Sequence, residues 1–258
     1  LGQASQNVLI NGERLSSKSD SARDQLQRIP ASDVVRIEIV DGTVLDIPGL
    51  AGQVANVVIQ RAGSSGQFRY TTGFRAHNTK AQLYGGEISL TGSSGALDYT
   101  VALSNGNQRF GADGDILITD GRGQLIETQA TKFSGGFDNP QLSTRFTYKF
   151  SNSVLANLNL KYGEDFFFEE TPELATPLDG PRRSRLAEAR ERGPEYEIGG
   201  DIEFPLGPGK MKLIALERFE RDEFRNSVVD SFDDGSLTRG NRFTQTNGIG
   251  ERIGRFEY

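Results

Sequence analysis

Hydrophobic and polar residues alternate along most of the chain beyond its first sixty residues. Near the middle, Leu158, Leu160 and Tyr162 alternate with Asn159 and Lys161. Successive side chains of a strand point to opposite faces, so each such strand has one apolar and one polar face. The pattern predicts eight strands, near residues 67–77, 81–91, 96–106, 124–150, 154–168, 194–204, 210–222 and 241–258.

Strand length and connection length favour a membrane-crossing barrel over a soluble sandwich, in which such alternation is equally common. The predicted strands exceed the usual five or six residues, and about 9–11 residues cross a bilayer at a tilt. Short and long connections also alternate, as is typical of outer-membrane barrels. The tight ones are Thr91–Gly95, Ser151–Ser153 and Pro205–Gly209, and the long ones are Asn105–Gly123, Glu169–Gly193 and Glu223–Gly240.

This alternation of connections depends on one segment. It requires Thr131–Phe150 to form a single long strand, with Phe137–Pro140 as a bulge or bend. If Asp138–Pro140 is instead a hairpin turn, the long loop at 169–193 falls on the side of the short turns. We prefer the single strand.

The first sixty residues predict a small mixed α/β unit of short elements. Asn7–Asn11 is an apolar run ending in an Asn-Gly turn signal, and Ser19–Arg28 favours a short helix. The β-branched run Val34–Val40 predicts a strand that stops at Asp41-Gly42, and Gln53–Gln60 predicts another. We therefore expect two domains, residues 1–62 and 63–258.

Composition narrows the class of protein. Hydrophobic residues make up 35% of the chain, the mean hydropathy is −0.48, and no run of 18 apolar residues occurs, which excludes a transmembrane helix. A barrel spanning a membrane is equally polar, because only alternate side chains meet lipid. The lack of Cys excludes a disulfide framework or a thiolate zinc site, and the net charge of −6 argues against a nucleic-acid binder.

Few residues are candidates for chemistry. His77 is the only histidine, which nearly excludes a Ser-His-Asp triad or a His-rich metal site, and we expect a solvated rim residue. Asp113, Asp115 and Asp120 resemble a calcium loop but lack its spacing and its closing Glu, so an extracellular loop is expected. No catalytic, cofactor-binding or metal site is predicted, the chain is not expected to be an enzyme, and ligand-binding residues stay unassigned.

Two later segments suggest contacts with a membrane or a ligand. Phe166 and Phe168 fit an aromatic girdle at the outer membrane interface or, alternatively, a stack on ligand. Arg182–Arg192 is expected to be a solvated loop or a short helix, whose Arg side chains suit lipopolysaccharide phosphates or an anionic ligand. The glycines at positions 42, 49 and 52 are expected to serve turns, since the strand–loop–helix context of a phosphate-binding loop is missing.

Three segments in order resemble the second half of the plug domain of TonB-dependent receptors: Gln6–Leu15, Leu26–Val40 and Gly49–Gln60. The stretch Gly235–Tyr258 is similar to barrel sequence of the same group. The resemblance implies an all-β-dominated membrane protein, with part of an antiparallel transmembrane β-barrel preceded by part of a small mixed α/β plug domain. One departure is Asp41, where the family commonly has a basic residue before Gly.

The resemblance also implies energy-coupled uptake of a scarce, large nutrient, such as siderophore-bound iron, cobalamin or a glycan, across the outer membrane of a Gram-negative bacterium. Expected partners are the TonB complex, acting through a segment outside this chain, outer-membrane lipid and lipopolysaccharide, and a small-molecule or oligosaccharide ligand, with no nucleic acid and no cofactor. The alternatives are a signalling or adhesion receptor on the same scaffold and a soluble all-β carbohydrate-binding domain. We expect a plug-to-barrel fragment whose unpaired sheet edges prevent stable folding alone.

Overall fold

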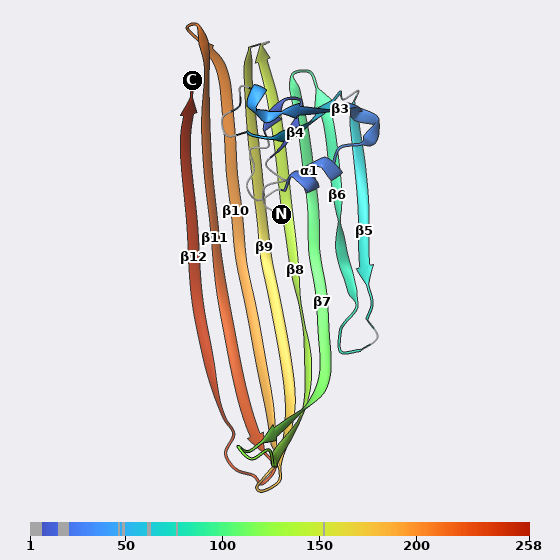
Figure 1. Ribbon diagram of the computed structural model, residues 1–258, viewed down its shortest axis with the longest axis vertical. Coiled ribbons are helices and arrows are strands. Elements are labelled where there is room, and N and C mark those ends of the chain that lie inside the picture. Colours follow the sequence, from blue (N-terminus) through green and yellow to red (C-terminus); the bar gives the residue numbers. More distant parts are fainter. Residues whose placement is uncertain are drawn as a thin grey trace.

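The chain folds into two β-sheets of very different size (Figure 1). The computed structural model describes residues 7–14, 21–45, 47, 50–60, 63–75, 77–151 and 153–258. The small sheet contains β1 (Val8–Ile10), β2 (Glu13–Arg14), β3 (Val34–Asp41) and β4 (Gln53–Ile59), with helix α1 (Ala22–Gln27) and 3-10 turns at Ala31–Asp33 and Gly42–Val44. The large sheet contains β5 (Ser64–Gly73), β6 (Gln82–Ser94), β7 (Leu97–Thr119), β8 (Leu125–Ser151), β9 (Val154–Pro177), β10 (Arg183–Leu206), β11 (Gly209–Phe232) and β12 (Arg239–Glu257).

The small sheet has the order β2-β1-β4-β3 and a conventional apolar core. Strands β1 and β4 run parallel, and the other neighbours run antiparallel. Leu9, Leu50 and Val54 form the core. Helix α1 begins where the Ser21 hydroxyl accepts a hydrogen bond from the Asp24 backbone N–H. The short helix and the strands expected in this region are confirmed, except that Ser19 and Asp20 lie outside the described residues.

The large sheet is an antiparallel meander of eight strands in sequential order. Each strand pairs with its neighbours in the chain, so β5 and β12 are the two edges, which do not pair with each other. The sheet is thus open at both edges, which is consistent with a partial barrel. The expected fold class and the eight expected strands are confirmed.

Strand β8 is continuous, as preferred; of the bulge or bend expected at Phe137–Pro140, the bulge is wrong. Its register with β9 has the same offset at Asp138, which lies opposite Phe166, and at Gln141, which lies opposite Gly163. The proline between them lacks a backbone N–H, and the ladder passes this position without a shift in register. The segment therefore needs no extra residue to stay in the sheet.

The three long loops are also wrong, because most of their residues are paired strand. Only residues 120–124, 178–182 and 233–238 connect β7 to β8, β9 to β10 and β11 to β12. The segment Arg182–Arg192, expected to be a loop or helix, belongs mostly to β10, where Arg183 and Arg185 form cross-strand ion pairs with Glu127 (3.2 Å) and Asp230 (2.8 Å). The charged residues of this segment suggest a loop from the sequence alone, but in the structure they are part of a paired strand.

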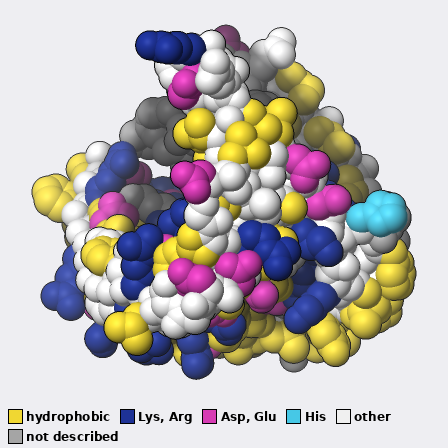
Figure 2. Space-filling view, turned by 90° about the horizontal axis from the view of Figure 1, so that it is seen from below, with side chains coloured by type: hydrophobic (Ala, Val, Ile, Leu, Met, Phe, Trp, Pro, Cys, Tyr) yellow, Lys and Arg dark blue, Asp and Glu magenta, His cyan; other side chains and the backbone are white. Residues whose placement is uncertain are grey.

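The two faces of the large sheet have opposite polarity. We call the face that the small sheet covers the inner face; its buried polar side chains include Asn157, Asn159, Glu195, Glu197 and Asp201. The opposite, outer face exposes large hydrophobic side chains, which gather along the lower right margin of Figure 2. The exposed hydrophobic side chains of the outer face include Phe68, Ile88, Leu103, Tyr148, Leu158, Leu160, Tyr162 and Ile198. Among the described residues, no helix is both long and apolar enough to cross a membrane.

Candidate functional site

The small sheet is held on the inner face of the large sheet by a buried ion pair. Arg28, at the C-terminal cap of α1, donates to Glu87 on β6 through Nε (3.3 Å) and Nη2 (3.0 Å). The two side chains are only 4% and 13% exposed. A charge buried this deeply is costly without its partner, so the pair fixes where α1 sits on the wall.

Neighbouring polar contacts extend this attachment along α1. Arg69 on β5 donates to Gln27 (2.9 Å), and Arg145 on β8 donates to Gln25 (2.8 Å). Helix α1 therefore contacts strands on both sides of Glu87 through side-chain hydrogen bonds. The interface consists largely of polar groups that water can also satisfy.

Lys212 on β11 makes a further link between the two sheets. Its ammonium lies 3.6 Å from Glu13 on β2 and 3.3 Å from Asp201 on β10. Asp201 also accepts a hydrogen bond from Asn157 (3.1 Å). The small sheet is thus anchored to the wall by charged groups at two separated places.

Two cavities lie around α1, and Arg28 lines both. The first, of about 310 Å³, lies between the small sheet and β7–β9 and is lined by polar groups such as Gln25, Asp98 and Arg145. The second, of about 270 Å³, lies toward β5–β7 and includes Arg69 and Glu87. The Arg28–Glu87 ion pair therefore stands where two spaces between the sheets adjoin.

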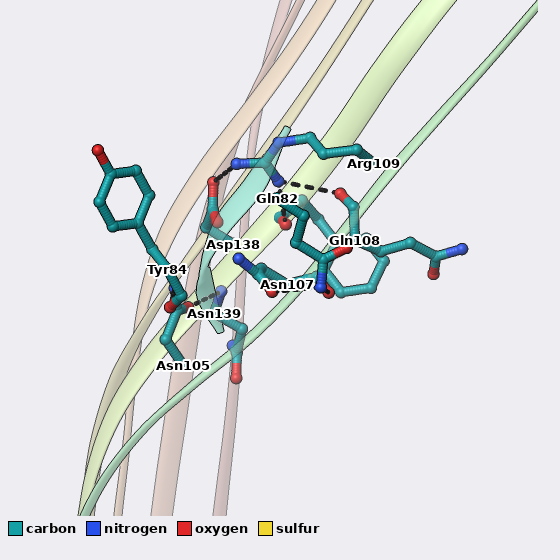
Figure 3. Close-up of polar contacts among 9 residues, drawn as sticks. Gln82, Tyr84, Asn105, Asn107, Gln108, Arg109, Asp138 and Asn139 are labelled. Carbon is teal, nitrogen blue, oxygen red and sulfur yellow. Dashed lines mark hydrogen bonds and ion pairs between the residues drawn. The ribbon is translucent and has the colours of Figure 1, made fainter. Parts of the chain in front are cut away.

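Strands β6 and β7 separate beside the second cavity, where Figure 3 shows the polar side chains. Their pairing ends at Gly86 and Asn105, and side chains bridge the gap beyond it. The Asn105 amide donates to the Tyr84 carbonyl (2.8 Å), and the Gln82 amide donates to the Asn107 carbonyl (2.8 Å). These side-chain amides replace ladder hydrogen bonds where the strands part.

The inner face continues as a charged wall away from the small sheet. Lys161 on β9 lies 2.6 Å from Glu195 on β10, and Arg218 on β11 lies 3.9 Å from the same carboxylate. Such groups present both donors and acceptors to anything that enters the space beyond the small sheet. They suit a polar solute better than an apolar one.

Most of the residues that the sequence singled out lie on separate elements and do not form one site. His77 is exposed in the connection between β5 and β6. Asp113 and Asp115 lie on β7, whereas Asp120 lies in the following turn and accepts hydrogen bonds from the backbone N–H groups of residues 122 and 124. In the part of the chain that the structure describes, no group of three His, Cys, Asp or Glu side chains is placed to hold a metal ion.

Phe166 and Phe168 lie on the outer face of β9, where Arg side chains cover them. The Arg192 guanidinium lies 5.2 Å from the Phe166 ring centroid, and that of Arg109 lies 5.3 Å from Phe168. Arg109 also forms an ion pair with Asp138 (2.7 Å; Figure 3). The aromatic residues are thus part of a charged zone.

Turn geometry explains two of the three early glycines. A Cβ at Gly42 would lie 2.9 Å from Val54 Cγ2, and Gly52 has a φ of +72° that favours glycine; the third, at position 49, lies outside the described residues. The Asp41 carboxylate accepts hydrogen bonds from the Thr43 backbone N–H (2.9 Å) and hydroxyl (2.8 Å), and these hold the pKa of Asp41 below its usual value. This acidic residue therefore caps a local turn.

No protein-family model matches the chain, and no curated protein sequence matches it. Among solved structures, a mutant of the ferric enterobactin receptor from Pseudomonas aeruginosa is similar with 12% identity and a TM-score of 0.29, over 97% of this chain and 52% of that one. The RagAB peptide importer is similar with 9% identity and a TM-score of 0.34, over 96% and 46%. The ferric yersiniabactin uptake receptor from Yersinia pestis is similar with 11% identity and a TM-score of 0.20, over 95% and 52%. The chain spans about half the length of these structures, and similarity at this level identifies no function.

Proposed function

We propose that the chain is the plug-to-barrel junction of an outer-membrane receptor that takes up a scarce, large nutrient. The observation that carries the proposal is the reversed polarity of the large sheet. Its charged face is buried under a small α/β sheet, and its apolar face is exposed. Residues 1–62 then belong to the plug and residues 63–258 to the barrel.

The height of the exposed apolar zone fits a bilayer. On the outer face of β10 the zone runs from Phe204 to Tyr196. Eight residues at about 3.3 Å each, tilted by roughly 40°, rise about 20 Å, close to the apolar band of about 25 Å on outer-membrane barrels. A soluble carbohydrate-binding domain would bury such a face, because contiguous apolar surface of this extent is rare on soluble monomers.

The attachment of the small sheet fits a plug that must be able to move. Arg28, Arg69, Arg145 and Lys212 hold it through ion pairs and hydrogen bonds. Water can replace such contacts when the sheet shifts, so the net cost of separating most of them is small. Because the outer membrane has no energy source of its own, the work would come from the TonB complex through a segment outside this chain.

The polar inner wall indicates a broad class of ligand. Lys161, Glu195 and Arg218 offer charges of both signs, which suits a polar solute such as an iron–siderophore complex, cobalamin or a glycan. The similar structures named above are receptors for ferric enterobactin and ferric yersiniabactin and a peptide importer. The proposed function, uptake of a nutrient, belongs to the same broad class.

A deletion strain tests the proposal. Its growth is measured in media limited in turn for iron, for cobalamin and for carbon supplied as polysaccharide, with the same strain lacking TonB as the comparison. We expect the deletion to cause a defect in one medium when TonB is present, no additional defect in a strain that already lacks TonB, and restoration by the full-length gene. Normal growth in all three media, or restoration that does not depend on TonB, would contradict energy-coupled uptake.

A further inference from the structure

Strands β7–β12 extend well beyond the small sheet, so part of their inner face lies past it (Figure 1). On β9 this part contains the five alternate, inward-facing residues from Gly163 to Thr171. Together with the residues paired to them in the same rows on the other five strands, they form what we call the aromatic band. The register is constant across these rows, so all the side chains of the band share the inner face with Lys161.

Six phenylalanines project from the inner face in the aromatic band. Phe110 stacks on Phe133 with ring centroids 5.5 Å apart, and its ring lies 6.5 Å from that of Phe167. A Cβ at Gly135 would lie 2.5 Å from the Phe110 ring, so the glycine makes room for it. The rings offer apolar faces on which a solute can stack. The six are Phe110, Phe133, Phe137, Phe167, Phe224 and Phe243, of which Phe137 and Phe243 are 38% and 53% exposed.

The aromatic band contains no inward-facing Lys or Arg in any of its rows, all of which belong to the described residues. The nearest inward cations on β9–β12 border it, with Lys161 and Arg218 in the row toward the small sheet and Arg185 and Arg239 in the row at the far end. The band is therefore a stretch of wall without positive charge between two rows that carry it.

Six carboxylates lie in the same band, and four of them have no cation as a partner. Lys161 pairs with Glu195 (2.6 Å) and Arg218 pairs with Glu220 (2.9 Å). Within the described part of the chain, the other four form no ion pair, so the band as a whole is negatively charged. These four are Asp165, Glu169, Glu191 and Asp222.

Glu191 lies at the centre of the band between two aromatic rings. It is directly opposite Phe167 on β9 and directly opposite Phe224 on β11. Such cross-strand neighbours have Cβ atoms only about 4.5–5.5 Å apart, so both rings lie beside the carboxylate. A cation at this place would meet an opposite charge and the negative faces of two rings, which is how proteins recognise organic ammonium groups.

The next row strengthens the negative charge beside Glu191. Asp165 and Asp222 flank Gly193 on either side, and a Cβ at Gly193 would overlap the Asp222 carboxylate. The glycine thus leaves room for that carboxylate to lie across the wall. An anionic solute would meet these charges without a cation to offset them, whereas a cation with an apolar body would satisfy both the carboxylates and the rings.

We propose that the aromatic band binds an organic cation, meaning an ammonium or guanidinium group on an apolar or aromatic body. Glu191 is the charge partner, Phe167 and Phe224 are the flanking rings, and Asp222 adds to the negative charge. This inference rests on the proposed function, because only a receptor would offer its inner face to a solute. It narrows the nutrient to one that carries positive charge.

Saturation-transfer NMR on the full-length protein in detergent micelles tests the charge preference. The probes are benzyltrimethylammonium and phenylacetate, which share an aromatic ring and differ in the sign of their charge. The cation is expected to bind at least about tenfold more tightly than the anion. Equal binding of the two probes, or no binding of the cation up to roughly 10 mM, would overturn the proposal.

Substitutions on the two faces of the same strands locate the site. Glu191→Gln should weaken binding of the cation at least about fivefold, and Phe224→Leu should weaken it about two- to fivefold, since it keeps an apolar side chain and loses the ring. The matched controls are Glu188→Gln on β10 and Phe219→Leu on β11, whose side chains lie on the outer face and which should bind normally.

Unchanged affinity in Glu191→Gln, or an equal loss in its outer-face control, would contradict the site, and circular dichroism verifies that each variant is folded. The growth test of the deletion strain separates this inference from the proposed function. A TonB-dependent growth defect without a preference for the cation contradicts the charge selectivity alone. A clear preference for the cation in a protein whose deletion causes no such defect contradicts uptake alone.

Discussion

The small sheet buries an apolar core, whereas the large sheet buries its polar face. In the small sheet Leu9 and Val54 are almost fully buried, as in a water-soluble core. In the large sheet Glu197 is almost fully buried while Ile198, the next residue, is half exposed. Alternation tells which residues share a face, and only the surroundings of the sheet decide which face is inside.

The junction between the sheets offers the largest expected effect. Arg28→Ala leaves Glu87 buried without its cation, which should destabilise the attachment of the small sheet by about 3–5 kcal/mol. The measurement is the urea concentration at which residues 21–60 become sensitive to protease in the full-length protein. The double variant Arg28→Met/Glu87→Leu removes both charges and should recover much of the loss; no recovery would mean that the ion pair is not what matters.

The second-largest effect is expected on the outer face of the large sheet. Leu158→Arg places a charge in the middle of the apolar zone and should cost about 2–4 kcal/mol of folding free energy in vesicles. The matched control is Glu170→Arg, on the same strand and face but beyond that zone, where the change should be small. Equal costs at the two positions, measured by urea unfolding in vesicles, would show that no lipid boundary separates them.

Substitution at the gap between β6 and β7 should cost less folding free energy. A Cβ at Gly85 would lie 2.5 Å from Asn107 Oδ1 and 2.8 Å from the Thr71 carbonyl, so Gly85→Ala must displace the bridging amide or the strand. We expect a loss of about 1–3 kcal/mol in the same unfolding measurement. Gly114→Ala, on the far part of β7 with nothing within 4 Å, serves as the control. A cost no larger than that of the control would rule out close contact at the gap.

The smallest expected effect concerns pH and the small sheet alone. The Thr43 N–H and hydroxyl lower the pKa of Asp41 in the folded state. Its contribution is therefore fully present above the unfolded pKa of about 3.9 and is lost as pH falls through the lower folded pKa. Hydrogen exchange of residues 41–45, compared between the natural protein and Asp41→Asn, should differ at neutral pH and converge in acid. A constant difference down to the lowest pH would contradict the cap.

Strand number, facing and the small α/β unit follow from the sequence because they depend on local periodicity. The extent of the strands does not: between Arg183 and Arg192 the segment is rich in Arg and Glu, and such a composition is as compatible with a loop or a helix as with a strand. Cross-strand ion pairs, which only the fold brings together, decide for the strand.

No local sequence pattern predicts how the small sheet is attached to the large one. Arg28 and Glu87 are 59 residues apart, and each is an ordinary charged residue in its own segment. Only the packing of α1 onto β6 turns them into a buried pair. The same holds for Glu191, whose place between Phe167 and Phe224 depends on the register of three strands.

The reversed polarity of the large sheet is tested most directly by spin labels attached to single cysteines, since the chain contains no Cys of its own. Labels are placed at Ile198 on the outer face and at Lys161 on the inner face of the full-length protein in vesicles. Collision with oxygen, which concentrates in lipid, and with a water-soluble nickel chelate is then compared. We predict that the label at position 198 meets oxygen and the label at position 161 meets the chelate. Access of the chelate to position 198 would contradict the membrane barrel.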